Sequence, residues 1–249
     1  MATADFTSHR LFVAGALAEG GAVELTADQS HYLVNVLRLG PGTELLVFNG
    51  REGEWRARIA STSKRGAKLD LVAETRPQTP MTGIHYLFAP LKHARLDYMV
   101  QKAVEMGVTR LSPVLTRRTV PDRVNLERMR LNAIEAAEQC GVLAIPGIDA
   151  PVPLSKALAL WDASWPLIFC DEDAAVRDPF QGLAALKPGP AGVLIGPEGG
   201  FHEEERQLLL SKPFVVALSL GPRILRADTA AVAALTLVNA TLGGWLSNV

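Results

Sequence analysis

Two glycine-bearing segments near the C-terminus constrain the fold of this chain most strongly. Residues 194–201 read Leu-Ile-Gly-Pro-Glu-Gly-Gly-Phe, and residues 218–230 read Leu-Ser-Leu-Gly-Pro-Arg-Ile-Leu-Arg-Ala-Asp-Thr-Ala. Each segment begins in a short apolar run typical of a buried strand and leads into a helical pattern. Glycine permits unusual backbone angles and close approach, and open α/β sheets bind ligands at the carboxyl ends of their strands. Two consecutive units of this kind predict a small-molecule site made largely of main chain.

The residues that follow the first segment narrow the kind of ligand. Residues 202–205 read His-Glu-Glu-Glu at the start of a predicted helix. Acidic side chains there suit the positive end of the helix dipole and occupy the place where a phosphate would bind. Neither segment matches the GxGxxG or GxxxxGK[ST] phosphate motifs. We expect a neutral or cationic ligand with an adenine and a ribose, for which S-adenosylmethionine is the obvious candidate; the alternative is two ordinary tight turns.

Strand and helix patterns alternate in the second part of the chain, which predicts an α/β fold with a mostly parallel sheet. The predicted strands are residues 84–89, 111–115, 166–170, 192–195 and 214–218, and the predicted helices include residues 96–104, which stop at Gly107, and residues 125–139. The last helix, from about residue 228 to 242, is apolar on nearly every side. Such a helix is expected to be buried, either within the fold or against a second copy of the chain.

The first 75 residues read as a small β-rich unit, and residues 76–80 are the best linker. The predicted strands are residues 11–13, 22–25, 44–48, 54–59 and 67–72. One helix interrupts them. Thr26 and Gln29 form a capping box at its start, and Leu33, Val36 and Leu37 supply its apolar stripe before it ends near residues 40–42.

Composition and charge exclude several classes of protein. No apolar run is long enough to span a bilayer, and the N-terminus lacks the pattern of a secretory signal, so the cytoplasm is the expected compartment. Cys140 and Cys170 make no disulfide framework, and the scattered histidines lack metal-ligand spacing, so we expect no metal. Nine Lys and Arg against four Asp and Glu lie in residues 81–130. A local basic region in a nearly neutral protein is typical of docking on one structured RNA; an unevenly charged, solvated surface is the alternative.

Several motifs in a fixed order resemble the RsmE family of methyltransferases. The similar segments are residues 196–200 (Gly-Pro-Glu-Gly-Gly), 220–226 (Leu-Gly-Pro-Arg-Ile-Leu-Arg), 31–38, 102–108, 117–120 and 135–139, so the resemblance covers nearly the whole chain from about Arg10. Two positions depart from the family's usual pattern: Val142 stands where an arginine is usual, and Asp228 stands where a glutamate is usual.

The resemblance implies a fold, an activity and partners. The fold is a SPOUT-type, mostly parallel α/β sheet with a C-terminal trefoil knot over residues 81–249, plus a small PUA-like RNA-binding β-barrel over residues 1–76. The activity is methylation of N3 of a uridine in the 16S rRNA of the small ribosomal subunit, with S-adenosylmethionine as cofactor, by a homodimer. A related SPOUT enzyme acting on tRNA or on a ribose 2′-hydroxyl, and a non-catalytic RNA-binding ribosome assembly factor, are the alternatives.

The resemblance also directs attention to particular residues. In the cofactor site, main-chain groups around Leu220, Gly221, Ile224 and Leu225 are expected to hold the adenine, Gly196, Glu198, Gly199 and Gly200 the ribose and methionine portions, and Leu194 and Phe169 to form apolar walls. Arginine stays charged and can stabilise an anionic uracil, so Arg10 and Arg226 are expected to be catalytic. The carboxylate of Asp228 or of Glu198 is expected to take the N3 proton, and the alternative for Asp228 is to cap the last helix. The expected RNA-binding residues are Arg38, Lys92, Arg117 and Arg118.

Overall fold

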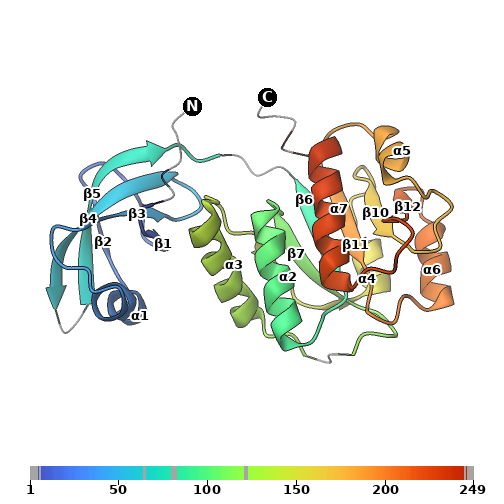
Figure 1. Cartoon of the computed structure of the whole chain (residues 1–249), viewed down its shortest axis with the longest axis horizontal. Helices are drawn as coiled ribbons and strands as arrows, with labels where there is room; N and C mark the ends of the chain where they lie inside the picture. The colour runs from blue at the N-terminus through green and yellow to red at the C-terminus, as the bar shows by residue number, and fades with distance from the viewer. Residues whose placement is uncertain are drawn as a thin grey trace. The chain divides into compact units, whose positions relative to one another are not determined.

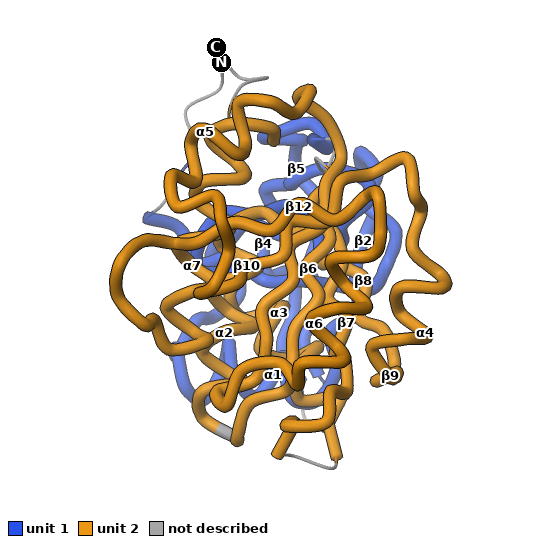
Figure 2. Tube along the Cα trace, turned by 90° about the vertical axis from the view of Figure 1, so that its right-hand side faces the viewer, with its two compact units in different colours: residues 1–80, 137–145 blue, residues 81–136, 146–249 orange. Residues whose placement is uncertain are grey.

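The computed structural model divides into two compact units. It describes residues 5, 7–63, 66–79, 83–120, 123–243 and 245. Unit 1 comprises residues 1–80 and 137–145, and unit 2 comprises residues 81–136 and 146–249 (Figure 2). Segment 137–145, which the predicted boundary assigned to the second domain, is therefore part of unit 1. Residues 80–82, where the predicted second domain begins, lie outside the described residues.

Unit 1 is built on a five-stranded mixed sheet in the order β1-β3-β4-β5-β2 (Figure 1). Strand β1 runs parallel to β3, and the other neighbours are antiparallel. Alternate residues of β4 and β5 point to opposite faces, which buries Ala57 and Ile59 against Leu69 and Leu71. The predicted strands are all present. Their bounds are β1 (Arg10–Phe12), β2 (Ala22–Glu24), β3 (Glu44–Phe48), β4 (Glu54–Ser63) and β5 (Gly66–Arg76).

The helix of unit 1 begins as predicted but ends differently. Helix α1 (Ala27–His31) has the capping box of Thr26 and Gln29, and it passes directly into the π-helix η1 (Tyr32–Val36). There the N–H of Leu37 donates to the carbonyl of Tyr32, five residues back. Because this wider turn breaks the 3.6-residue period, the predicted apolar stripe is wrong at Val36, which is 58% exposed.

Unit 2 is built on a parallel sheet in the order β12-β10-β11-β6-β7-β8, with β9 pairing to β7. All of its pairings are parallel, so the predicted α/β architecture is confirmed. The predicted strands are present, and the short β8 and β9 were not predicted. The strands are β6 (Ile84–Phe88), β7 (Arg110–Leu115), β8 (Gly147–Ile148), β9 (Val152–Pro153), β10 (Leu167–Cys170), β11 (Ala191–Ile195) and β12 (Val215–Leu218).

Helices cover both faces of this sheet. Helices α2 and α7 pack together, and α7 also contacts β11 and α5, whereas α4 packs against β7 and α6 against β12 (Figure 1). Seven positions of α7 are buried in the chain's own fold, which is one of the two burials its apolar sequence allowed. The trefoil knot stays a prediction. The helices are α2 (His93–Glu105), α3 (Leu126–Cys140), α4 (Leu154–Ala159), α5 (Pro179–Ala184), α6 (Glu203–Leu210) and α7 (Ala227–Thr241).

Within the described part of the chain, none of these helices combines the length and the apolar character needed to cross a membrane.

Candidate functional site

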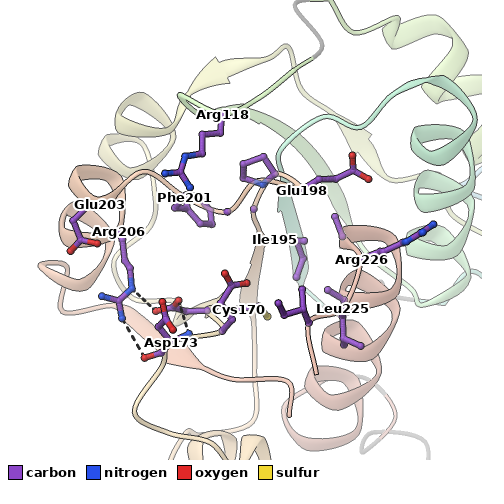
Figure 3. A pocket seen from close by; sticks show the side chains of 18 of the residues that line it. Arg118, Cys170, Asp173, Ile195, Glu198, Phe201, Glu203, Arg206, Leu225 and Arg226 are labelled. Atoms are coloured by element: carbon purple, nitrogen blue, oxygen red, sulfur yellow. Dashed lines mark hydrogen bonds and ion pairs between the residues drawn. The ribbon is translucent and has the colours of Figure 1, made fainter. Parts of the chain in front are cut away.

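A cavity of about 560 Å³ lies in unit 2 at the carboxyl ends of β10 and β11, in front of the start of α7 (Figure 3). Three chain segments form its walls: residues 170–173 after β10, residues 195–203 around the first glycine turn, and residues 224–230 after the second glycine turn. Carboxyl ends of parallel strands meet at one edge of a sheet, and this is where open α/β sheets bind ligands. The two glycine turns singled out in the sequence therefore face a common cavity.

Glycine is required by contact at one position of the first turn and by conformation at another. A Cβ on Gly196 would lie 2.4 Å from the ring of Phe201, and that ring packs edge-on against Phe169 at 5.2 Å between centroids. Gly200 adopts a φ of +70°, a conformation that side chains disfavour. The Gly200 N–H donates to the carbonyl of Pro197, which closes the turn. The first turn thus has a defined shape set by small residues.

Two arginines from other parts of the unit hold this turn in place. Arg95 of α2 forms an ion pair with Glu198, and Nη1 of Arg118 donates to the carbonyl oxygen of Gly199 at 2.7 Å. Both arginines also line the cavity. The turn is therefore tied to α2 and to the segment after β7.

The helix that follows the turn occupies its own N-terminal donors. His202 is its N-cap and forms a capping box with Glu205. Arg117 pairs with Glu204, and its main-chain N–H donates to Glu205 at 2.9 Å. Because acidic groups and a cap already fill this helix start, it is not available to a phosphate. Arg117, which was predicted to bind RNA, therefore uses part of its hydrogen-bonding capacity in contacts with α6.

The third wall was missed by the sequence reasoning. Asp171, which is 7% exposed, accepts a hydrogen bond from Nε of Arg206 at 2.9 Å and another from the N–H of Asp173 at 3.2 Å. Arg206 therefore joins α6 to the loop after β10. The signal that would have pointed here is the run Asp-Glu-Asp at residues 171–173, directly after a buried strand. Arg206 and Arg95, far away in sequence, gave no such signal.

Cys170 also lines this wall. Burial raises the pKa of its thiol to about 12, so the group is a neutral thiol near pH 7. It can contribute an apolar contact to a ligand, but not a thiolate nucleophile.

The second glycine turn has fewer tertiary contacts. Gly221 has a φ of +112°, and among the described residues its N–H and carbonyl interact only with the nearby Ser219 hydroxyl. Ile224, Leu225 and Arg226 line the cavity, and Ile224 is 88% exposed.

The start of α7 excludes one of the two alternatives for Asp228, the N-cap. The N-cap of α7 is Arg226, and Asp228 lies in the first turn, where its carboxylate accepts from the N–H of Thr229 at 2.8 Å. Asp228 is therefore not the N-cap. It does not line the cavity, although the preceding residue, Ala227, does.

The structure brings half of the predicted cofactor residues to the lining of the cavity, together with two arginines predicted for other roles. Seven predicted site residues line the cavity, namely Gly196, Glu198, Gly200, Ile224, Leu225, Arg226 and Arg118. Gly199 lies between the lining residues Glu198 and Gly200, whereas Leu220 and Gly221 lie in the second turn, ahead of its lining residues 224–227. Phe169 and Leu194 do not line it; both are buried in an apolar core cluster, against which Phe201 packs. Ile195 and Phe201 supply apolar walls in their place.

Arg10 was predicted to be catalytic, and the geometry does not support this. Its side chain is 4% exposed and pairs with Glu54 at 2.8 Å. Its Nη1 donates to the carbonyls of Ala137 and Glu138 at the end of α3, within unit 1. Burial lowers the pKa of Arg10. Burial opposes ionisation of Glu54, but the hydrogen bond from Arg76 and the charge of Arg10 outweigh it and lower the pKa of that carboxyl. Arg10 is thus buried among groups of its own unit, where its Nη2 lies 2.8 Å from a Glu54 oxygen but makes no hydrogen bond.

The remaining predicted residues lie elsewhere. Arg38 of unit 1 has a φ of +58°, the one non-glycine residue in the left-handed region within the described ranges. Lys92 of unit 2 is the exposed N-cap of α2 and lines a different cavity, of about 710 Å³, together with Arg123. Val142, at a position where the family usually has an arginine, is half-buried in unit 1. Over the described ranges, no group of three or more His, Cys, Asp or Glu side chains could hold a metal ion.

Comparison with known proteins defines the class first. Residues 77–239 match the family model described as an RNA methyltransferase domain, and residues 25–72 match the one described as an RNA methyltransferase PUA domain. The chain is therefore an RNA methyltransferase by family, with the PUA unit that the resemblance implied.

Individual relatives identify the family within this class of RNA methyltransferases. Ribosomal RNA small subunit methyltransferase E of Rickettsia conorii is 30% identical over 92% of this chain and 94% of its own length. The protein of the same name from Synechocystis is 33% identical over 94% and 78%. A crystal structure of the Neisseria gonorrhoeae enzyme of this name, bound to S-adenosyl methionine, superposes with a TM-score of 0.86 at 26% identity, covering 95% and 98%. The chain belongs to the ribosomal RNA small subunit methyltransferase E family, which confirms the RsmE resemblance.

Proposed function

We propose that this protein transfers a methyl group from S-adenosylmethionine to N3 of a uridine in the 16S rRNA of the small ribosomal subunit. The observation that carries the proposal is the cavity formed where two glycine turns meet beyond β10 and β11, lined by main chain and by nearly balanced charges, five carboxylates and four arginines. The helix start beside it is already occupied by the His202 cap and by acidic groups, so a ligand without phosphate fits this cavity best. The relatives named above act, by their names, on small-subunit rRNA, and one was crystallised with this cofactor.

The residues present fit the cofactor. The main chain around Leu220, Gly221, Ile224 and Leu225 would hold its adenine, and the first turn, with Gly196, Glu198, Gly199 and Gly200, would lie along its ribose and methionine portions. Phe169 and Leu194 would support this turn from the core side, because Phe169 packs on Phe201. When bound, S-adenosylmethionine supplies an electrophilic methyl group.

The chain's own residues would handle the uracil. N3 must lose its proton before it can attack a methyl group, so negative charge develops on the uracil oxygens. Arg226 lines the cavity, and it forms no ion pair with another described residue, so its guanidinium is free to stabilise that charge. Asp228, two residues after Arg226 in the first turn of α7, is our proposed proton acceptor.

We further propose how the substrate is held. Arg38, Lys92, Arg117 and Arg118 would contact the RNA backbone, since arginine and lysine supply position more than sequence readout. A second copy of the chain would complete the assembly through the α7 region. Because the substrate would be the small ribosomal subunit, we propose that the reaction takes place in the cytoplasm.

Methyl transfer from labelled S-adenosylmethionine tests the proposal directly. Purified protein is incubated with assembled small subunits or with free 16S rRNA, and the nucleosides are analysed by mass spectrometry. We expect 3-methyluridine, absent when Arg226 is replaced by alanine. Isothermal titration calorimetry with S-adenosylmethionine is run in parallel, and we expect it to detect binding of the cofactor.

The alternatives give different products. A 2′-O-methylated nucleoside, or methylation of tRNA alone, would assign the chain to another reaction of the wider superfamily. RNA binding without measurable cofactor binding would identify an assembly factor without catalysis. Either result contradicts the proposed activity.

A further inference from the structure

The rim of the cavity carries opposite charges on its two sides. Figure 3 shows Asp173, Glu203 and Arg206 on one side, and Leu225 and Arg226 on the other. On the first side Arg206 neutralises Asp171, which leaves the exposed carboxylates of Glu172, Asp173 and Glu203. Arg118, between the sides, adds one positive charge but is engaged with Gly199.

The opposite side is positive and apolar. In loop 221–226 the guanidinium groups of Arg223 and Arg226 are exposed and form no ion pair with any residue in the described part of the chain. Between them, Ile224 is 88% exposed, which is more than any other large apolar residue in the described ranges. On this side the one acid that lines the cavity, Glu198, is already paired with Arg95.

A nucleic-acid strand carries one negative charge per nucleotide and is repelled by unpaired carboxylates. It therefore approaches over the side that offers free cations. Exposed apolar groups next to cations suit the ribose and base of a nucleotide whose phosphate pairs with the arginine.

We propose that loop 221–226 is the surface over which the RNA strand enters the cavity. Arg223 binds a phosphate next to the target nucleotide, and Ile224 packs against the adjoining nucleoside. The main-chain groups of the same loop remain for the adenine of the cofactor, and the strand does not cross the acidic side. This inference rests on the proposed function, because it takes RNA as the substrate of this cavity.

A charge-reversal pair tests the direction of entry. R223E is compared with K187E, because Lys187 is also exposed but shares a cavity with Pro166, Pro190 and Phe214, which immediately precede β10, β11 and β12 at the opposite edge of the sheet. RNA affinity is measured with a 16S rRNA fragment over a range of KCl concentrations. We expect R223E to weaken binding about tenfold and to reduce the salt slope by roughly 0.7 to 0.9, the effect of one lost phosphate contact. K187E should change neither.

Ile224→Ala separates the apolar contact from the charge. It should weaken RNA binding severalfold while leaving the salt slope unchanged. Equal effects of R223E and K187E would overturn the inference. So would a change in oligomeric mass, measured by light scattering, without a change in RNA affinity, because the loop would then be an interface between copies.

Failure of the inference is distinguishable from failure of the proposed function. The wild-type protein is assayed in the same series for S-adenosylmethionine binding and for methyl transfer. If both are present and R223E binds RNA like the wild type, only the entry path is wrong. If the wild type shows neither cofactor binding nor methyl transfer, the proposed function is wrong, whatever R223E does to the RNA affinity.

Discussion

The two glycine turns have similar sequences but are held very differently. In residues 196–202, Arg95 and Arg118 reach in from other elements, and Phe201 fills the space above Gly196. In residues 219–226, the polar contacts of Gly221 are made with Ser219, two residues away, and Ile224 faces outward. The first turn, residues 196–202, is thus a fixed wall of the cavity that distant side chains hold in place. The second turn, residues 219–226, is an open lip at the edge of the cavity with mainly local contacts.

This difference teaches what a glycine motif can and cannot specify. A strand, a glycine-proline step and a helix predict where the chain turns. Side chains from distant segments decide whether that turn is rigid. A fixed wall suits a ligand that must be aligned, because orientation lowers the barrier of a transfer reaction. A lip with free groups suits a partner that must enter and leave.

The largest effect should come from Gly196→Ala. The added Cβ would lie 2.4 Å from one ring carbon of Phe201 and 2.9 Å from another, and Phe201 cannot retreat freely because Phe169 backs it. Relieving this overpacking would displace the turn, at a cost of about 2 kcal/mol. Because the cofactor binds the undisplaced turn, we expect its affinity to fall by the same free energy, roughly 30-fold. Isothermal titration calorimetry measures it.

Gly147→Ala, in β8 of the same unit, is the matched control for that substitution. Its Cβ would meet nothing closer than Arg110 Cγ at 3.8 Å, an ordinary contact, and Gly147 does not line the cavity. Cofactor affinity should stay near the wild-type value. If Gly196→Ala and Gly147→Ala bind the cofactor equally well, the first turn is not a fixed wall of the cavity.

Arg118→Ala should have an intermediate effect. It removes the hydrogen bond to the Gly199 carbonyl. Because the guanidinium is exposed, we expect about 1 kcal/mol, or roughly fivefold weaker cofactor binding. Hydrogen exchange at residues 197–201 should quicken. Unchanged exchange there would mean that Arg118 does not hold the turn.

Arg95→Ala should have a smaller effect. The Arg95–Glu198 pair is 38% and 51% exposed at its two side chains, and such pairs contribute about 0.5 kcal/mol, or about twofold in affinity. The difference between variant and wild type should disappear in high salt, which screens exposed charges. A salt-independent loss would show that the pair does more than hold a surface loop.

The smallest effect on the cofactor is expected from Ile224→Ala in the second turn. The side chain is 88% exposed, and the expected cofactor contacts of this turn are main-chain groups. Calorimetry should give an S-adenosylmethionine affinity within about twofold of the wild type, as expected for exposed surface substitutions. A large loss would make the second turn a side-chain wall like the first, and the contrast between the turns would fail.

Much of the fold and part of the site could be predicted from local patterns. Apolar runs located every predicted strand of both sheets, and Thr26 with Gln29 located the start of α1. Val36 was misplaced because a π-helix changes which residues share a face. Phe169 and Leu194 were misplaced because an apolar residue at a strand end can face either the ligand or the core, and the strand's register decides which.

Arginines were the hardest residues to interpret. Arg10 and Arg226 were both predicted to be catalytic. The structure buries Arg10 with Glu54 and the last carbonyls of α3, whereas Arg226 lines the cavity without an ion-pair partner among the described residues. A sequence gives the charge of an arginine but not its partners, which here come from residues 44 and more than 120 positions away.

The amino-acid sequence by itself determined the parallel α/β sheet, the β-rich first unit, the two glycine turns and the absence of a phosphate motif, because each depends on neighbours within a few residues. Only the tertiary structure decided that Asp171 and Arg206 close a third wall, that Arg118 holds Gly199 and that Arg10 is internal. Those facts depend on contacts between segments far apart in the chain, and packing alone selects which distant groups come within hydrogen-bonding distance.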